Sequence, residues 1–133
     1  MKNSKILKTI LFIAGAMFVA AGVGTLFFPI EFSANHGVDL IQNTPTLNDI
    51  RGAGGLMLGA GIIIVLGVIH KGMAFTSTVV SAVLYTVFAL SRIISFQLDE
   101  SFTEGLLKAA IVELVMGALG IFSLIKYRDK SQS

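Results

Sequence analysis

The sequence contains no cysteine and no tryptophan, and it has only two prolines and two histidines. Without cysteine, the chain can form no disulfide, no thiolate nucleophile and no cysteine-based metal site. It also contains no dinucleotide-binding or haem-attachment motif. We therefore expect no metal, no cofactor and no catalytic residue, which favours a protein that is not an enzyme.

Charge is also scarce. Charged residues make up 14% of the chain and hydrophobic residues 54%, with a mean hydropathy of +0.83. A soluble domain of 133 residues needs a more polar surface than this composition provides. The formal net charge of +2 is small and scattered, which excludes nucleic acid as a partner.

Long apolar runs dominate what remains. They cover residues 6–28, 50–69, 74–96 and 105–125. A helix needs about 20 apolar residues to cross a hydrocarbon core of about 30 Å. The runs therefore predict an all-α fold, a four-helix transmembrane bundle, in which residues 1–133 form a single membrane domain. The first run exceeds the roughly 7–15 residues of a signal-peptide core, so we interpret it as a retained helix.

Basic residues mark one side of this bundle. They lie in both tails and in the turn between the second and third runs: Lys2, Lys5, Lys8, Lys71, Lys126, Arg128 and Lys130. The two remaining connections are acidic: Glu31, Asp39, Asp49, Asp99, Glu100 and Glu104. Lysine and arginine near span ends favour the cytoplasm. We expect a multi-pass protein of the bacterial inner membrane with both termini in the cytoplasm. His36 and His70 would then lie on opposite sides and could not share a metal.

The longest connection, residues 29–46, begins with Pro29, which ends the first helix. Its apolar and polar residues alternate, which is typical of a segment that lies on the membrane surface or covers the bundle. Thr46 or Asn48 is expected to cap the second helix, and Ser101 with Glu104 forms a capping-box pattern before the fourth.

Polar residues recur along the third helix at intervals of three and four. The series is Ser77, Ser81, Tyr85, Phe88, Arg92, Ser95 and Asp99, in which only Phe88 is apolar. This spacing places them on one helix face, which in a membrane must meet protein or water. The face either forms hydrogen bonds between helices or lines a cavity.

Glu113 stands within an apolar run, where a carboxylate is costly unless it is neutral, hydrated or paired. Arg51 and Arg92, at the ends of other runs, are its candidate partners. One interpretation is a buried ion-pair network that sets the helix register. The other is a polar pocket in the outer leaflet, with Asp49 and Asp99 at its rim, for an anionic or strongly polar head group.

Glycines share faces with these charged residues. Gly55 and Gly59 fall on the face of Arg51, and Gly117 and Gly120 fall on the face of Glu113. Small residues at such intervals let helix backbones approach closely. We expect these four glycines to pack against neighbouring helices.

Several segments together carry a family resemblance. They are Phe28-Pro29 after the first helix, DIRGAGGL at 49–56, SRIIS at 91–95 and VEL at 112–114. They resemble a family of small bacterial four-helix membrane proteins of unknown function that is similar to the DoxX-like proteins. The resemblance implies a four-helix bundle with Arg51, Arg92 and Glu113 at the family's polar positions. By analogy it also implies an association with quinone or sulfur redox chemistry.

Three hypotheses about function follow. The first is a non-catalytic membrane protein with an outward-facing polar pocket for a lipid head group or small amphiphile. The second is an accessory or structural subunit of a larger membrane complex, which would require a protein partner or a second copy of the chain. The third is a quinone-linked redox component. Membrane lipids are partners in all three.

Overall fold

The computed structural model describes residues 1–37, 43–99 and 103–129, apart from the side chains of Thr44 and Asp99. This part of the chain contains no strand. Its elements are α1 (Lys5–Phe27), α2 (Pro29–Asn35), α3 (Thr44–Ile69), η1 (Lys71–Met73), α4 (Ala74–Asp99) and α5 (Glu104–Tyr127). The predicted all-α bundle is confirmed, and α1, α3, α4 and α5 are each long and apolar enough to cross a membrane.

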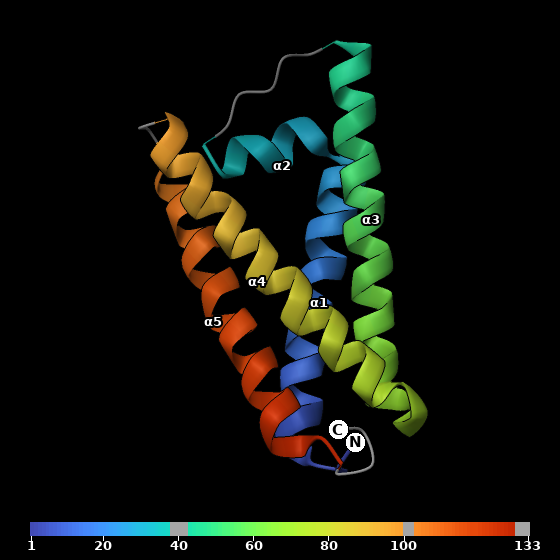
Figure 1. Ribbon diagram of the computed structural model, residues 1–133. Coiled ribbons are helices and arrows are strands. Elements are labelled where there is room, and N and C mark those ends of the chain that lie inside the picture. The colour runs from blue at the N-terminus through green and yellow to red at the C-terminus, as the bar shows by residue number, and fades with distance from the viewer. Residues whose placement is uncertain (38–42, 100–102, 130–133) are drawn as a thin grey trace.

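The long helices associate as two pairs. The extensive contacts are those of α1 with α3 and of α4 with α5. The pairs approach each other at the end that carries both chain termini and diverge toward the other end (Figure 1). The short helix α2 lies across that wider end. The pairs are therefore joined near the termini and spanned by α2 at the opposite end.

Glycines explain the tight contact of α1 with α3. A Cβ atom on Gly22 would lie 2.5 Å from the backbone nitrogen of Leu58, and one on Gly61 would lie 2.7 Å from that of Val19. The two backbones therefore touch where neither helix carries a side chain. This corrects the prediction for Gly55 and Gly59, because a Cβ on either of these would meet open space.

The second pair uses the predicted face of α5. A Cβ on Gly117 would lie 2.8 Å from the hydroxyl of Thr86, and one on Gly120 would lie 2.7 Å from the Cα of Ala82. Both glycines are buried against α4. The face of α5 that carries Glu113 is thus the face that packs.

The outer surfaces of the long helices are strongly apolar. Leu56 is 74% exposed and Ile125 is 78% exposed, and many other large aliphatic side chains also point outward. Such surfaces would be costly in water but suit a hydrocarbon solvent. The four apolar helices indicate a multi-pass membrane protein.

Helix starts differ from the sequence predictions at two places. Helix α3 begins at Thr44, and its cap is Asn43, whose side chain accepts a hydrogen bond from the backbone nitrogen of Thr46 (2.9 Å). Thr46 and Asn48 therefore lie inside the helix. Pro45 explains the early start, because the first turn needs no backbone donor at that position.

Helix α5 is capped by Thr103, whose hydroxyl accepts a hydrogen bond from the backbone nitrogen of Leu106 (3.1 Å). The expected capping residue, Ser101, lies outside the described residues. Pro29 ends α1 as predicted, but it also starts α2, so part of the predicted loop is helical.

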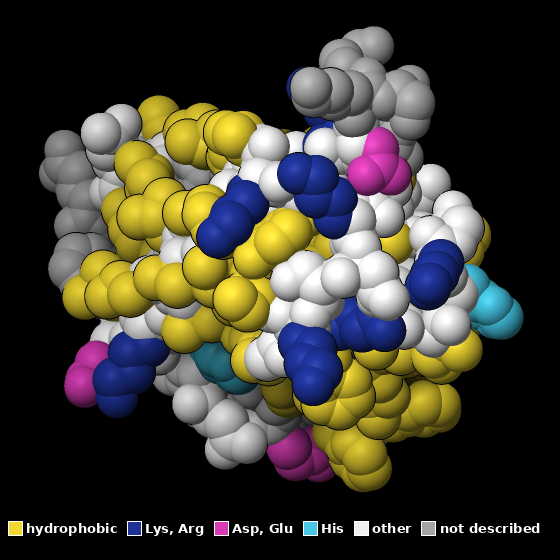
Figure 2. Space-filling model, turned by 90° about the horizontal axis from the view of Figure 1, so that it is seen from below, with side chains coloured by type: hydrophobic (Ala, Val, Ile, Leu, Met, Phe, Trp, Pro, Cys, Tyr) yellow, Lys and Arg dark blue, Asp and Glu magenta, His cyan; other side chains and the backbone are white. Residues whose placement is uncertain are grey.

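The end with the termini is rich in basic side chains. Seen from below, Lys and Arg are spread over this face (Figure 2). The α-amino group of Met1 pairs with Asp129 (2.5 Å), and the backbone nitrogen of Lys2 donates to the carbonyl of Tyr127 (2.7 Å). The N-terminus is thereby attached to the end of α5.

Candidate functional site

A cavity of about 540 Å³ lies between the two helix pairs, beneath α2. Helices α1, α2, α4 and α5 each contribute several lining residues, whereas α3 contributes only Met57 among those described. The cavity therefore occupies the half of the bundle where the pairs diverge.

An ion pair forms part of one wall. Arg92 Nε donates to both carboxylate oxygens of Glu113, at 2.9 and 3.0 Å. The Arg92 side chain is 29% exposed and that of Glu113 is 14% exposed. From the rise of a helix, Arg92 lies about 10 Å from the end of α4 and Glu113 about 14 Å from the start of α5. The pair thus lies at hydrocarbon depth, on the α2 side of the bundle.

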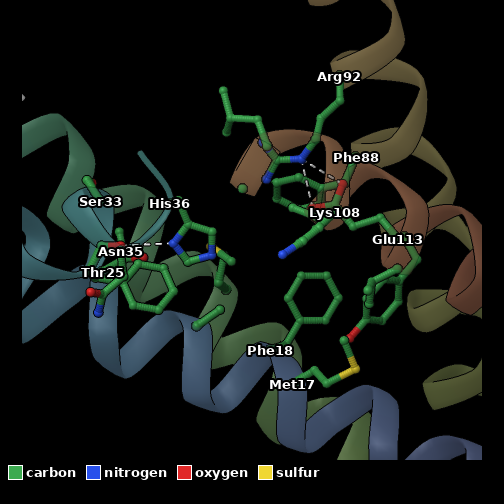
Figure 3. Close-up of a pocket in the computed structure, with 18 residues that line it drawn as sticks. Met17, Phe18, Thr25, Ser33, Asn35, His36, Phe88, Arg92, Lys108 and Glu113 are labelled. Carbon is green, nitrogen blue, oxygen red and sulfur yellow. Dashed lines mark hydrogen bonds and ion pairs between the residues drawn. The ribbon is translucent and has the colours of Figure 1, made fainter. Parts of the chain in front are cut away.

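Lys108 and His36 also line the cavity (Figure 3). Lys108 projects from α5, and its side chain is 72% exposed. Its Nζ lies 3.3 Å from Oε1 of Glu104, which precedes it by one helical turn. His36 follows α2, and its Nδ1 donates to the backbone carbonyl of Phe32 (2.9 Å), since a carbonyl can only accept. In neutral His36, Nε2 is therefore the unprotonated nitrogen.

Aromatic rings form the deep end. The ring of Phe18 lies 4.4 Å from that of Tyr85 and 5.7 Å from that of Phe88, measured between centroids. The Tyr85 hydroxyl donates to the carbonyl of Ala14 (2.5 Å). Because this hydroxyl is satisfied by the backbone of α1, the deep end presents mainly apolar surface to the cavity.

The polar face of α4 serves both of its expected purposes, at different levels. Ser77 is buried and donates to the carbonyl of Ile63 on α3 (2.6 Å). Ser81 is also buried, and its hydroxyl has no hydrogen-bond partner among the described residues. Tyr85 and Arg92 line the cavity one and three turns further on. The face thus joins helices near the termini and lines the cavity near α2.

Helix α2 is attached to the start of α5. The hydroxyl of Thr103 donates to the carbonyl of His36 (2.8 Å). A Cβ on Gly105 would lie 2.7 Å from that same carbonyl oxygen, so only glycine permits this approach. Gly37, with φ of 75°, adopts the left-handed conformation directly after the contact. Two glycines and one threonine thus position α2 over the cavity.

The structure separates the predicted site residues. Arg92, Glu113 and Tyr85 are together at the cavity, whereas Arg51 and Asp49 are exposed on α3 and do not line it. Arg51 belongs to α3, which diverges from α4 toward this end of the bundle (Figure 1).

The remaining predicted rim residues do not line the cavity either. Ser95 is exposed on α4, and the side chain of Asp99 lies outside the described residues. Sequence reasoning missed Lys108 and His36 as cavity residues. Neither carried a clear signal: Lys108 lies five residues before Glu113, about 140° around the helix, and the place of His36 depends on the position of α2. No three His, Asp or Glu side chains in the described ranges are grouped to hold a metal.

Comparison with known proteins addresses the family of the chain. A family model described as "Domain of unknown function (DUF4345)" matches residues 6–124. Neither the curated proteins nor the solved structures include a significant match. The matched segment covers nearly all of the four long apolar helices and all of the described residues that line the cavity. The chain therefore belongs to the DUF4345 family, whose function is unknown.

Proposed function

We propose that this protein binds a small amphiphile in the cavity between its helix pairs and does so without catalysis. The observation that carries the proposal is the distribution of side chains around the cavity. Aromatic side chains of α1 and α4 and two methionines contribute an apolar part of the lining, and Arg92, Lys108 and Glu113 contribute a charged part. Its volume of about 540 Å³ lies within the roughly 300–1,000 Å³ typical of ligand pockets.

The arrangement matches the two ends of an amphiphile. A polar head would meet Arg92 and Lys108, and an apolar tail would contact Phe18 and Phe88. Glu113 holds the guanidinium of Arg92 in place through both of its oxygens. The ion pair would thus contribute to packing of α4 on α5 and to binding at once.

We further propose that the cavity faces the outside of a bacterial inner membrane. The basic end of the bundle carries both termini and the turn at Lys71 (Figure 2). Basic residues near span ends favour the cytoplasm, so α2 and the cavity would lie in the outer leaflet. A ligand would then enter from the outer leaflet or from the periplasm.

Native mass spectrometry tests the proposal on protein released from its own membrane with small molecules retained. We expect a recurrent bound amphiphile in the wild type and its loss in Ala109→Phe, because Ala109 lines the cavity and a ring there would obstruct it. Ala118→Phe is the matched control, since Ala118 is exposed on the same helix.

Other outcomes would support other functions. Equal ligand retention in both variants would contradict binding in this cavity. A bare chain with a stoichiometric partner protein, or a stable complex of several copies, would indicate an accessory subunit instead. A bound quinone would support the redox hypothesis, which rests on the resemblance to DoxX-like proteins.

A further inference from the structure

We infer that the ligand is an amphiphile with one chain and an anionic head, such as a fatty acid or a lysophospholipid, recognised by Arg92 and Lys108. This inference rests on the proposed function and specifies its ligand class. Three properties of the cavity carry it: the unused donors of the guanidinium, the charge of the lining and the available volume.

The guanidinium of Arg92 uses only one of its donors in the ion pair. Both contacts with Glu113 come from Nε. Within the described part of the chain, neither Nη group donates a hydrogen bond to a protein atom. The two Nη groups form an edge with parallel N–H bonds, which matches the two oxygens of a carboxylate or phosphate. Glu113 thus orients a fork that remains available to a ligand.

The charge of the lining favours an anion. The described lining residues include two cationic side chains, Arg92 and Lys108, and one carboxylate, Glu113, which leaves a surplus of one positive charge. Glu104, the partner of Lys108, is 83% exposed and does not line the cavity. An exposed pair of this kind contributes little, so Lys108 can exchange Glu104 for a ligand at small cost. A neutral head group could not take the place of Glu104 as the counter-ion of Lys108.

The volume matches a ligand with one chain. A methylene group is similar in size to a water molecule, which takes about 30 Å³ of liquid, so 540 Å³ holds about 18 such groups. One acyl chain with its head approaches this size, and a second chain would have to remain outside. Met17 and Met57 suit such a chain, because flexible thioether side chains adapt to irregular apolar ligands.

The test measures displacement of radiolabelled palmitate from the full-length protein in a neutral detergent. The competitors are palmitate, palmitoyl-lysophosphatidic acid, monopalmitoylglycerol and dipalmitoylphosphatidylglycerol. We expect the two anionic single-chain compounds to compete at least tenfold better than the neutral single-chain and the anionic two-chain compound. The order between the first two then identifies carboxylate or phosphate as the preferred head.

Variants separate anion recognition from folding. Glu113→Gln keeps the guanidinium and removes the one carboxylate among the described lining residues, so palmitate should bind equally well or more tightly. The double variant Arg92→Gln with Glu113→Gln leaves no unpaired charge and should bind palmitate at least tenfold more weakly. Lys108→Gln should weaken palmitate binding severalfold. Arg51→Gln is the matched control and should change nothing, because Arg51 is exposed outside the cavity.

Each alternative result contradicts a different statement. Equal competition by monopalmitoylglycerol would contradict the preference for an anionic head group. Tighter binding of dipalmitoylphosphatidylglycerol would contradict the preference for a single chain. Either result leaves the proposed function standing. Unchanged palmitate affinity in the double variant would overturn the role of Arg92. If no compound bound to the wild type, or if Ala109→Phe bound all of them as the wild type does, the proposed function itself would fail.

Discussion

The hydroxyl of Tyr85 donates a hydrogen bond of 2.5 Å to the main-chain carbonyl of Ala14. Both residues are buried, with 3% and 0% of their surfaces exposed. The bond connects α4 with α1 and therefore links the two helix pairs directly. It lies at the deep end of the cavity, where the tail of a bound amphiphile would end.

Replacing Tyr85 by Phe should lower the free energy of unfolding by only about 0.6 kcal/mol, and at most by about 1.7 kcal/mol, because hydrogen bonds between membrane helices are individually weak. Unfolding by sodium dodecyl sulfate in mixed micelles measures this difference. Tyr127→Phe is the control, because the Tyr127 hydroxyl is buried with no hydrogen-bond partner among the described residues. A larger loss in Tyr127→Phe than in Tyr85→Phe would contradict the assigned role.

Removing one member of the ion pair should cost more than removing both. The Glu113 side chain is only 14% exposed. Arg92→Ala removes its partner, and we expect the free energy of unfolding to fall by about 2 kcal/mol. The double variant Arg92→Gln with Glu113→Gln should lose less than half of this. The same micelle titration measures both. If the double variant instead loses the sum of what Arg92→Gln and Glu113→Gln each lose alone, the side chains do not interact.

The orientation can be tested with introduced thiols, because the chain contains no cysteine. Glu31→Cys places a thiol on the exposed surface of α2, and Lys71→Cys places one in the turn before α4. If the basic end faces the cytoplasm, a membrane-impermeant maleimide should label only position 31 on intact cells. Labelling of position 71 alone would reverse the proposed orientation.

The sequence predicted the long helices well because the solvent imposes their length. Helix α1 spans Lys5–Phe27, within one residue of the predicted run at each end. Arg92 and Glu113 were also recognisable, since each is a charge within or beside an apolar run. Their contact depends on α4 and α5 being neighbours, which the short connection between them already favours.

Other features depend on tertiary structure. Arg51 has the same sequence signature as Arg92, yet it is exposed outside the cavity because α3 diverges from α4. Gly54 and Gly55 are adjacent and chemically identical, but only Gly54 faces a neighbouring helix. A Cβ atom on Gly54 would lie 2.8 Å from the backbone nitrogen of Leu26, whereas one on Gly55 would meet open space. The rotation of α3 about its axis selects between them. Periodicity alone does not reveal that rotation.

Two other glycines of α3 should respond in opposite directions to substitution by alanine. Gly61→Ala places a Cβ 2.7 Å from the backbone of Val19 and should destabilise the protein by about 1–3 kcal/mol. Gly59→Ala meets open space and should stabilise it by about 0.5–1 kcal/mol, because alanine is a better helix former than glycine. Thermal unfolding in detergent distinguishes them. Equal shifts would mean that α1 and α3 are not in backbone contact at Gly61.

Access to the cavity should depend on the attachment of α2 to α5. Gly105→Val would place side-chain atoms against the carbonyl of His36, which lies 2.7 Å from the Cβ position, and would displace α2. In an Ala109→Cys background, the only thiol lies in the cavity wall, and its maleimide labelling rate measures access. We expect Gly105→Val to increase that rate severalfold. Thr103→Ala should increase it less, because it removes one hydrogen bond and leaves the close contact intact.

Gly72→Val is the control, since Gly72 lies in η1, at the opposite end of the bundle from α2, with open space at its Cβ position. If labelling is equally fast in the parent and in Gly105→Val, α2 does not limit entry, and a ligand must reach the cavity between the helices from the lipid.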